Sequence, residues 1–269
     1  MESANEGWIG SIPVQGPRSQ PDYCVGFRRS AFTDERLSRF DPLIGSVYDT
    51  SFLVATYRMY FPFLMCEVKC GVAALDIADR QNAHSMTVAV RAVVELYKAV
   101  KREKELHREI LAFSISHDHS SVRIYGNYAV IDENKTTFYR HPIHKFDFTA
   151  LDGKDKWTAY KVTKMSTTVW MPTHLKRICS VIGQLPRDLN FEGFQGSELQ
   201  FAEASELSQE VGGLLSEHSQ VNLIHEHVKT TVSWPHLLRK WTPKIPRSLK
   251  ERNEQHLKAE KEAWWEVAI

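Results

Sequence analysis

The stretch Phe61-Pro-Phe-Leu-Met-Cys-Glu-Val-Lys-Cys-Gly71 decides how the rest of this sequence is interpreted. It is one of the most apolar runs in the chain, and a glutamate and a lysine stand near its end, before a glycine. Side chains alternate between the two faces of a strand, so Glu67 and Lys69 are expected on the same face. Because a buried unpaired charge is costly, these charges need a partner, which can be a structural ion pair or a metal ion.

The composition is that of an ordinary globular protein. The chain has 269 residues, 42% of them hydrophobic and 25% charged, and its formal net charge is +1. No apolar run approaches the roughly 18 residues that a membrane span needs, and the first residues lack the pattern of a signal peptide. The four cysteines form no Cys-x-x-Cys pair, which favours reduced thiols over disulfides or zinc ligands. These features predict an intracellular protein, nuclear or cytoplasmic, without a membrane partner.

The chain divides into three parts by composition. Residues 1–20 are rich in Gly, Pro, Ser and Gln and lack periodicity, which predicts a flexible lead-in. Residues 21–191 form the expected folded domain. Residues 192–269 are polar, with seven glutamates and no Lys or Arg in 192–228, then eight basic and three acidic residues in 239–261. This last part predicts a helical or partly disordered appendage, which can fold on a protein partner.

The patterns in the folded domain predict an α/β protein with a mixed central sheet flanked by helices. The longest helix follows the central strand directly, and its early residues Ile77, Gln81 and His84 recur at helical spacing. Strands are expected at 21–27, 61–71, 109–116, 121–130 and 136–141, and helices at 33–39, 76–107, 157–169 and 174–182.

The two charges of the central strand belong to a Glu-x-Lys triplet. About two triplets of the form Asp/Glu-x-Lys are expected by chance in a chain of this size. Three occur, but those at 133–135 and 152–154 lie in predicted turns beside Asn and Gly. Only the triplet at 67–69 ends an apolar strand, and an earlier strand opens with Pro21-Asp22, the sole Pro-Asp in the chain. The two strand ends therefore form the candidate site.

These residues resemble the PD-(D/E)xK nuclease superfamily, which has the restriction-endonuclease-like fold. Pro21-Asp22 matches its first half-motif, and Glu67-Val68-Lys69 matches its second. The chain from Pro21 to about residue 190 also resembles a family of fungal proteins placed near that superfamily, for which no substrate is known. The sequence departs from the superfamily in the long interval between the half-motifs and in first residues unsuited to the usual opening helix. It also has Ser85 where a tyrosine often follows the helix glutamine.

The resemblance implies a nuclease that uses Mg²⁺, or Mn²⁺ as a substitute, and acts on nucleic acid, with DNA the first expectation. Asp22 and Glu67 would supply carboxylate oxygens to the metal, with the Val68 carbonyl as a third ligand. Lys69 would orient the attacking water, and Gln81 would position water or substrate. Many nucleases of this fold act as dimers, so a homodimer is compatible with the resemblance.

The alternative is a nuclease-like scaffold without catalysis that binds nucleic acid or a protein partner. The near-neutral body, the missing opening helix and the acidic-then-basic tail favour it. For Glu67 and Lys69 the simpler interpretation is an ion pair at a strand end, and Gln81 can be a surface residue. A zinc site is the weaker hypothesis because no spaced second ligand pair is evident among its candidates His117, Asp118, His119, His141 and His144.

Overall fold

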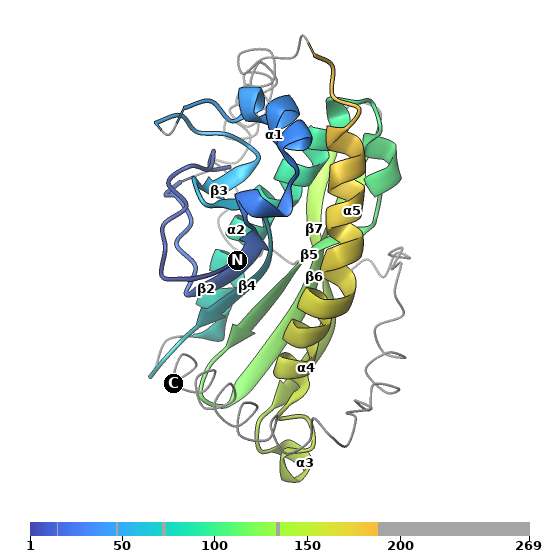
Figure 1. Ribbon diagram of the computed structural model, residues 1–269. Helices are drawn as coiled ribbons and strands as arrows, with labels where there is room; N and C mark the ends of the chain where they lie inside the picture. The colour runs from blue at the N-terminus through green and yellow to red at the C-terminus, as the bar shows by residue number, and fades with distance from the viewer. Residues whose placement is uncertain (15, 47, 72–73, 133–134, 188–269) are drawn as a thin grey trace, which may run out of the picture.

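A computed structural model describes residues 1–187 except 15, 47, 72–73 and 133–134. The described residues form a seven-stranded mixed sheet flanked by helices, which confirms the predicted α/β class (Figure 1). The appendage predicted at 192–269 lies outside the described residues. No helix in the described ranges has the length and apolar character of a membrane span.

The sheet is organised around the parallel pair β4 (Met59–Val68) and β5 (Ile110–His117). Every other pair of neighbouring strands is antiparallel; the order is β1-β2-β4-β5-β6-β7, and β3 also pairs with β4. A parallel pair needs a crossover connection, and α2 (Leu75–Lys98) supplies it. The other strands are β1 (Glu2–Ala4), β2 (Tyr23–Phe27), β3 (Val54–Thr56), β6 (Ser121–Ile131) and β7 (Thr136–Asp147).

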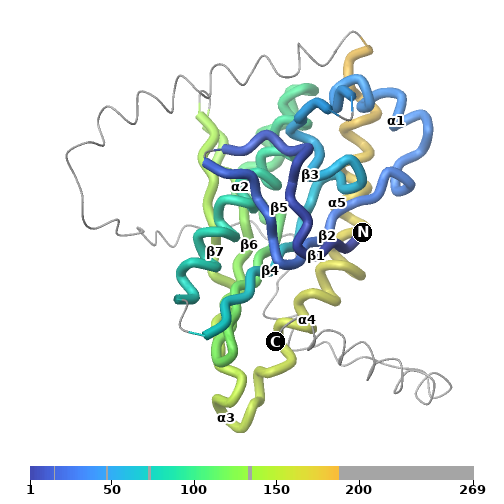
Figure 2. The backbone as a smooth tube through the Cα atoms, turned by 90° about the vertical axis from the view of Figure 1, so that its left-hand side faces the viewer, coloured from blue at the N-terminus to red at the C-terminus, as the bar shows by residue number. Residues whose placement is uncertain are grey.

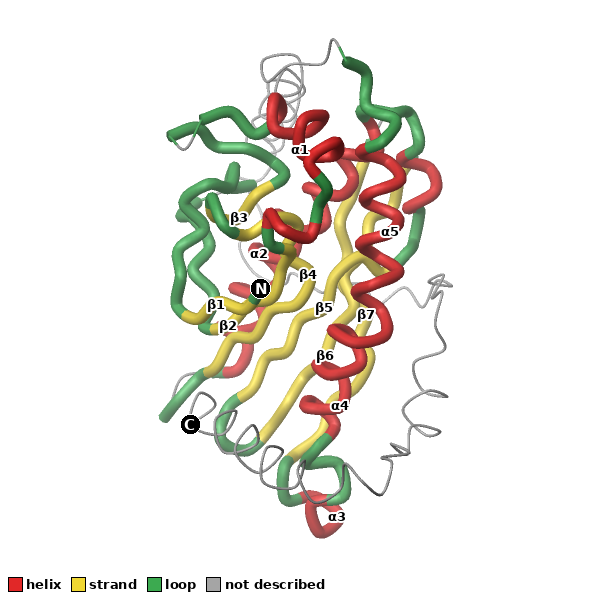
Figure 3. The backbone as a smooth tube through the Cα atoms, in the orientation of Figure 1, coloured by secondary structure: helices red, strands yellow, loops and turns green. Residues whose placement is uncertain are grey.

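Helices cover the sheet from two sides (Figures 2 and 3). α2 packs along β4 and β5, and the run formed by α4 (Thr158–Met165) and α5 (Met171–Ile182) lies on the opposite side. The Trp170 ring contacts Phe63 of β4 and Phe113 of β5, which joins this helical run to the centre of the sheet. The short elements are η1 (Arg29–Ala31), α1 (Asp34–Phe40), η2 (Asp41–Leu43), η3 (Glu103–Leu106) and α3 (Ala150–Gly153).

The first 20 residues pack against the domain, in contrast to the flexible lead-in expected from their composition. β1 pairs with β2, and the Trp8 side chain is completely buried. The backbone N–H of Trp8 donates to the Ser19 carbonyl, and the backbone N–H of Gly10 donates to the Ala55 carbonyl. A single buried tryptophan and a three-residue strand leave no periodic signal, so the sequence pattern misses this packing.

α2 ends at Lys98 and not at the predicted residue 107. Lys101 has a left-handed backbone with φ +58°, and the Arg102 N–H donates to the Tyr97 carbonyl. This arrangement caps the last carbonyl groups of a helix and turns the chain away from its axis. The charged residues that follow form the separate helix η3.

The face of α2 that contacts the sheet differs from the predicted stripe. Ile77 and Gln81 are exposed, whereas Asp79, Asn82 and Ser85 are buried. The inward positions in the first turns of α2 are thus mixed, since Leu75 and Ala78 are buried as well, and the continuous apolar face begins later in the helix. The polar start of α2 covers the sheet next to the end of β4.

The two predicted C-terminal helices form one continuous helical run. Ser166–Trp170 is a π-helix between α4 and α5, and Pro172 lies in the first turn of α5. A proline inside an α-helix removes a hydrogen bond and clashes with the preceding turn, and a wider π-turn relieves both constraints. The proline therefore marks a change of helix type and not a break.

β7 extends to Asp147, beyond the predicted end at residue 141. Pro142 lies within it, opposite Tyr125 of β6, next to a shift in register. β7 is the last strand in the sheet order, and an edge strand tolerates a residue without an N–H.

Candidate active site

The two half-motifs meet at one end of the sheet. β2 and β4 pair with Tyr23 opposite Cys66, so Asp22, which directly precedes β2, comes opposite Glu67. Directly opposed residues of an antiparallel pair share a face of the sheet. The Val68 N–H donates to Asp22 Oδ2 at 2.7 Å, which holds the aspartate against the end of β4. Two carboxylates separated by 45 positions in the chain are thereby brought together.

Glu67 is a buried carboxyl group with a raised pKa. Its side chain is 3% exposed, and its Oε2 lies 3.5 Å from the Nζ of Lys69. Burial is the main cause that raises the pKa of Glu67 to about 7, the Asp22 carboxylate adds to it, and Lys69 opposes it. The group therefore changes its charge near neutral pH.

Lys69 lies one residue beyond β4 and remains bound to the sheet. Its N–H donates to the His117 carbonyl of β5 at 2.9 Å, and its side chain returns to Glu67 on the same face. The structure thus brings Asp22, Glu67 and Lys69 together, with the Val68 peptide next to both carboxylates.

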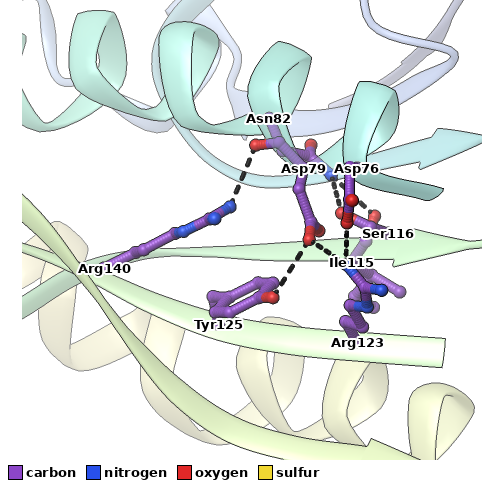
Figure 4. Close-up of polar contacts among 8 residues, drawn as sticks. All are labelled: Asp76, Asp79, Asn82, Ile115, Ser116, Arg123, Tyr125 and Arg140. Atoms are coloured by element: carbon purple, nitrogen blue, oxygen red, sulfur yellow. Dashed lines mark hydrogen bonds and ion pairs between the residues drawn. The ribbon is translucent and has the colours of Figure 1, made fainter. Parts of the chain in front are cut away.

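Gln81 is the helix amide that the resemblance would assign to positioning water or substrate. It is exposed on α2, whereas its neighbour Asn82 is 1% exposed. The Asn82 Nδ2 donates to the Ile115 carbonyl and to Ser116 Oγ, both at 2.9 Å (Figure 4). Ser116 pairs with Glu67 in the parallel register, so Asn82 contacts the strand beside the carboxylates. Counting back by helical turns from the buried run at the end of α2 would have indicated Asn82.

A second polar group, which we call the arginine cluster, comprises Asp76, Asp79, Arg123, Tyr125 and Arg140 (Figure 4). Asp79 Oδ2 accepts hydrogen bonds from Arg123 Nη1 at 2.5 Å and from the Tyr125 hydroxyl at 3.2 Å. Arg123 Nη1 also donates to Asp76 Oδ1 at 2.6 Å. Arg140 Nη1 donates to the Asp79 carbonyl at 3.0 Å. Sequence reasoning missed this cluster because its members come from α2, β6 and β7 and form no motif.

The donor atoms at the end of β4 fit a hard divalent cation. Asp22 and Glu67 offer two carboxylates, and Mg²⁺ in proteins commonly takes one or two carboxylates and completes its shell with water. A cation would also offset the burial of the Glu67 carboxylate, the main cause of its raised pKa, and the repulsion from Asp22 that adds to it.

No zinc-type cluster appears among the described residues. No group of three or more His, Cys, Asp or Glu side chains gathers there with the geometry of a metal site. Of the histidines considered, His117 is buried in β5 and His144 of β7 lies 3.7 Å from Asp155. The histidines therefore contribute no ligand set to the candidate site.

Comparison with known proteins finds a family whose model matches most of the chain. The family described as "Domain of unknown function (DUF7924)" matches residues 1–182. No curated protein and no solved structure matches the chain. The matched range includes Asp22, Glu67, Lys69 and every described strand of the sheet. Because the match covers more than half of the 269 residues, the chain belongs to the DUF7924 family.

Proposed function

We propose that this protein is a metal-dependent nuclease that hydrolyses phosphodiester bonds in nucleic acid, with DNA as the expected substrate, in the nucleus or cytoplasm. The observation that carries the proposal is the convergence of Asp22, Glu67 and Lys69 at one end of the sheet. These are the residues that the resemblance to PD-(D/E)xK nucleases implies, and they come from segments that only the fold brings together.

Each residue has a chemical role in this proposal. Asp22, Glu67 and the Val68 carbonyl would hold Mg²⁺ or Mn²⁺, which when bound neutralises charge on the phosphate and lowers the pKa of water. The Lys69 ammonium lies 3.5 Å from Glu67 and can donate a hydrogen bond to the attacking water. Glu67 ionises near pH 7, so its metal-binding form is accessible under neutral conditions.

The test is cleavage of supercoiled plasmid in Mg²⁺ and in Mn²⁺. Wild type is compared with Glu67→Gln and Lys69→Met, which keep side-chain volume, and with Glu105→Gln as a control. Glu105 pairs with Arg102 in the helical turn η3 and has no role in the site. We expect the first two variants to lose about 100-fold or more in rate, because one removes a carboxylate ligand of the metal and the other a donor to the attacking water. The control should cut like wild type.

Full activity of folded Glu67→Gln would contradict the assignment of this site. If wild type cuts no plasmid, the same comparison is made with single-stranded DNA and with RNA. Absence of cleavage on all of them would exclude the nuclease proposal.

The second candidate function is a nuclease-like scaffold that binds nucleic acid or a protein without catalysis. The contact between Lys69 and Glu67 favours it, because this ion pair partly compensates the buried carboxylate without a metal. Calorimetric titration with Mn²⁺ separates the two candidates. Binding by wild type that is lost in Asp22→Asn and in Glu67→Gln supports the enzyme, and absence of binding by wild type supports the scaffold.

A further inference from the structure

We propose that Arg123 and Arg140 bind the phosphate backbone of the DNA beside the carboxylate centre, and that buried Asp79 fixes both guanidinium groups for this purpose. The inference rests on the proposed function for the identity of the bound strand. Its location rests on the contacts of the arginine cluster (Figure 4).

A row of paired residues leads across the sheet from Glu67 to Arg123. Glu67 of β4 pairs with Ser116 of β5, and Ser116 pairs with Arg123 of β6. Paired residues share a face, and neighbouring strands are about 4.8 Å apart, so about 10 Å separates the two backbones. That distance is about the axial rise of three nucleotides in one strand of DNA, which would pass over the start of α2 because Ser116 is buried beneath Asn82. The row continues to Lys145 of β7, which is exposed.

Asp79 holds the two arginines from different strands. Its side chain is 5% exposed, and its Oδ2 binds Arg123 and Tyr125. Its carbonyl accepts the Arg140 hydrogen bond, and the Arg140 guanidinium lies over the Tyr125 ring at 4.6 Å. Side chains that are already fixed lose little conformational freedom when a ligand binds.

Each guanidinium keeps donors for a ligand. In the described part of the chain, Arg123 and Arg140 donate hydrogen bonds through Nη1 only. Their Nε–H and Nη2–H groups make no hydrogen bond within the described residues. These two donors lie on one edge of the guanidinium and can bind two oxygens of a phosphate at the same time. The Arg123 side chain is 24% exposed, so a phosphate can reach it.

Asp76 places a negative charge on the guanidinium group that would bind the phosphate. It is 69% exposed and shares Arg123 Nη1 with the buried Asp79. Ion pairs of exposed side chains are weak, whereas a bidentate contact between arginine and phosphate is strong. The exposed Asp76 carboxylate therefore repels a phosphate bound to the other edge of Arg123, while Asp79 keeps the arginine in place.

The test measures binding of the full chain to fluorescently labelled oligonucleotides by fluorescence anisotropy. Ca²⁺ replaces Mg²⁺ so that the oligonucleotide is not cleaved during the measurement. Duplex DNA, single-stranded DNA and RNA of the same sequence are compared. Arg102→Gln is the control, because Arg102 also makes a carboxylate pair, with Glu105. Circular dichroism melts establish that each variant is folded.

We expect Arg123→Gln and Arg140→Gln each to weaken binding about tenfold, and to lower the slope of log affinity against log salt by about one. Asp76→Asn should tighten binding several-fold because it removes a negative charge beside the bound phosphate. Arg123→Lys keeps the positive charge but loses the paired guanidinium donors, so its affinity for the oligonucleotide should lie between those of wild type and Arg123→Gln. Arg102→Gln should bind like wild type.

Unchanged affinity in both glutamine variants would overturn this inference, even where plasmid cleavage establishes the nuclease. Arginine-dependent binding without cleavage by wild type would retain the phosphate contact and remove the catalytic part of the proposed function. Binding of RNA but not DNA would overturn the choice of DNA. Absence of binding to any of the three oligonucleotides would overturn both proposals.

Discussion

Glu67 ionises at a different pH in the folded protein than in the unfolded chain. Its pKa is about 7 when folded, against an ordinary value of 4.5. Between these values the folded protein retains a proton that the unfolded chain has released, so this group lowers stability as the pH rises from 4.5 to 7. Above pH 7 the full cost is roughly 3 kcal/mol.

Glu67→Gln should therefore stabilise the protein in neutral and alkaline solution. The amide cannot ionise, so the variant should exceed wild type by up to roughly 3 kcal/mol at pH 8. The difference should shrink to nearly zero at pH 4.5. Urea denaturation at several pH values measures it, and a difference that does not depend on pH would contradict the assigned cause.

Metal binding should release a proton from the same carboxyl group. Because a metal ligand must be ionised, binding of Mn²⁺ at pH 6 should release most of one proton, and at pH 9 almost none. Titration calorimetry in buffers of different ionisation enthalpy measures the number of protons released per bound metal ion. Equal heats in all buffers at pH 6 would mean that Glu67 is not a ligand.

α2 shows at the level of one element how differently two neighbouring helix positions can be placed. Gln81 was predicted from its distance to Lys69, but the residue that faces the sheet is Asn82. A shift of one position moves a helical side chain by about 100°. At the start of α2 buried polar residues stand among the apolar ones and the apolar Ile77 is exposed, so the apolar pattern does not mark the inward face.

Replacing these two neighbours should separate their roles. Asn82→Ala removes the hydrogen bonds to Ile115 and Ser116 inside the protein and should lower the free energy of unfolding by about 1–3 kcal/mol. Gln81→Ala changes an exposed side chain and should stay within about 0.5 kcal/mol of wild type. Thermal and urea denaturation of both variants measure the contrast, and an equal loss would contradict the orientation of α2.

The helical run of α4 and α5 contains a histidine that should make the fold sensitive to acid. His174 stacks on Trp170 at 4.2 Å, and burial lowers its pKa to about 3, with a further contribution from Arg177. The unfolded chain takes up the proton near pH 6.5, so stability falls as the pH drops from 6.5 towards 3.

His174→Phe keeps an aromatic ring in the stack and removes this titration. Relative to wild type, the variant should gain about 2 kcal/mol between pH 8 and pH 5, since each pH unit contributes about 1.4 kcal/mol. Denaturation curves at both pH values test this. A constant difference between the proteins would show that His174 does not titrate as its burial indicates.

For the whole molecule, local patterns predicted the α/β class, the central strand and the long helix after it. The pair Asp22 and Glu67 was also predicted, because both stand at the ends of apolar strands and match half-motifs. The arginine cluster and the burial of Trp8 were not predicted, because they depend on contacts between segments far apart in the chain. The packing of α2 and of the first residues against the sheet defines these contacts.

The pairing of β1 with β2 has a consequence for how the protein behaves in solution. β1 lies along β2 and occupies backbone groups that would otherwise form an open edge. An uncovered strand edge is a template for the edge of another molecule, which leads to aggregation. Deletion of residues 1–20 should therefore convert the protein to self-associating material in size-exclusion chromatography, although the deletion leaves Asp22, Glu67 and Lys69 in the chain.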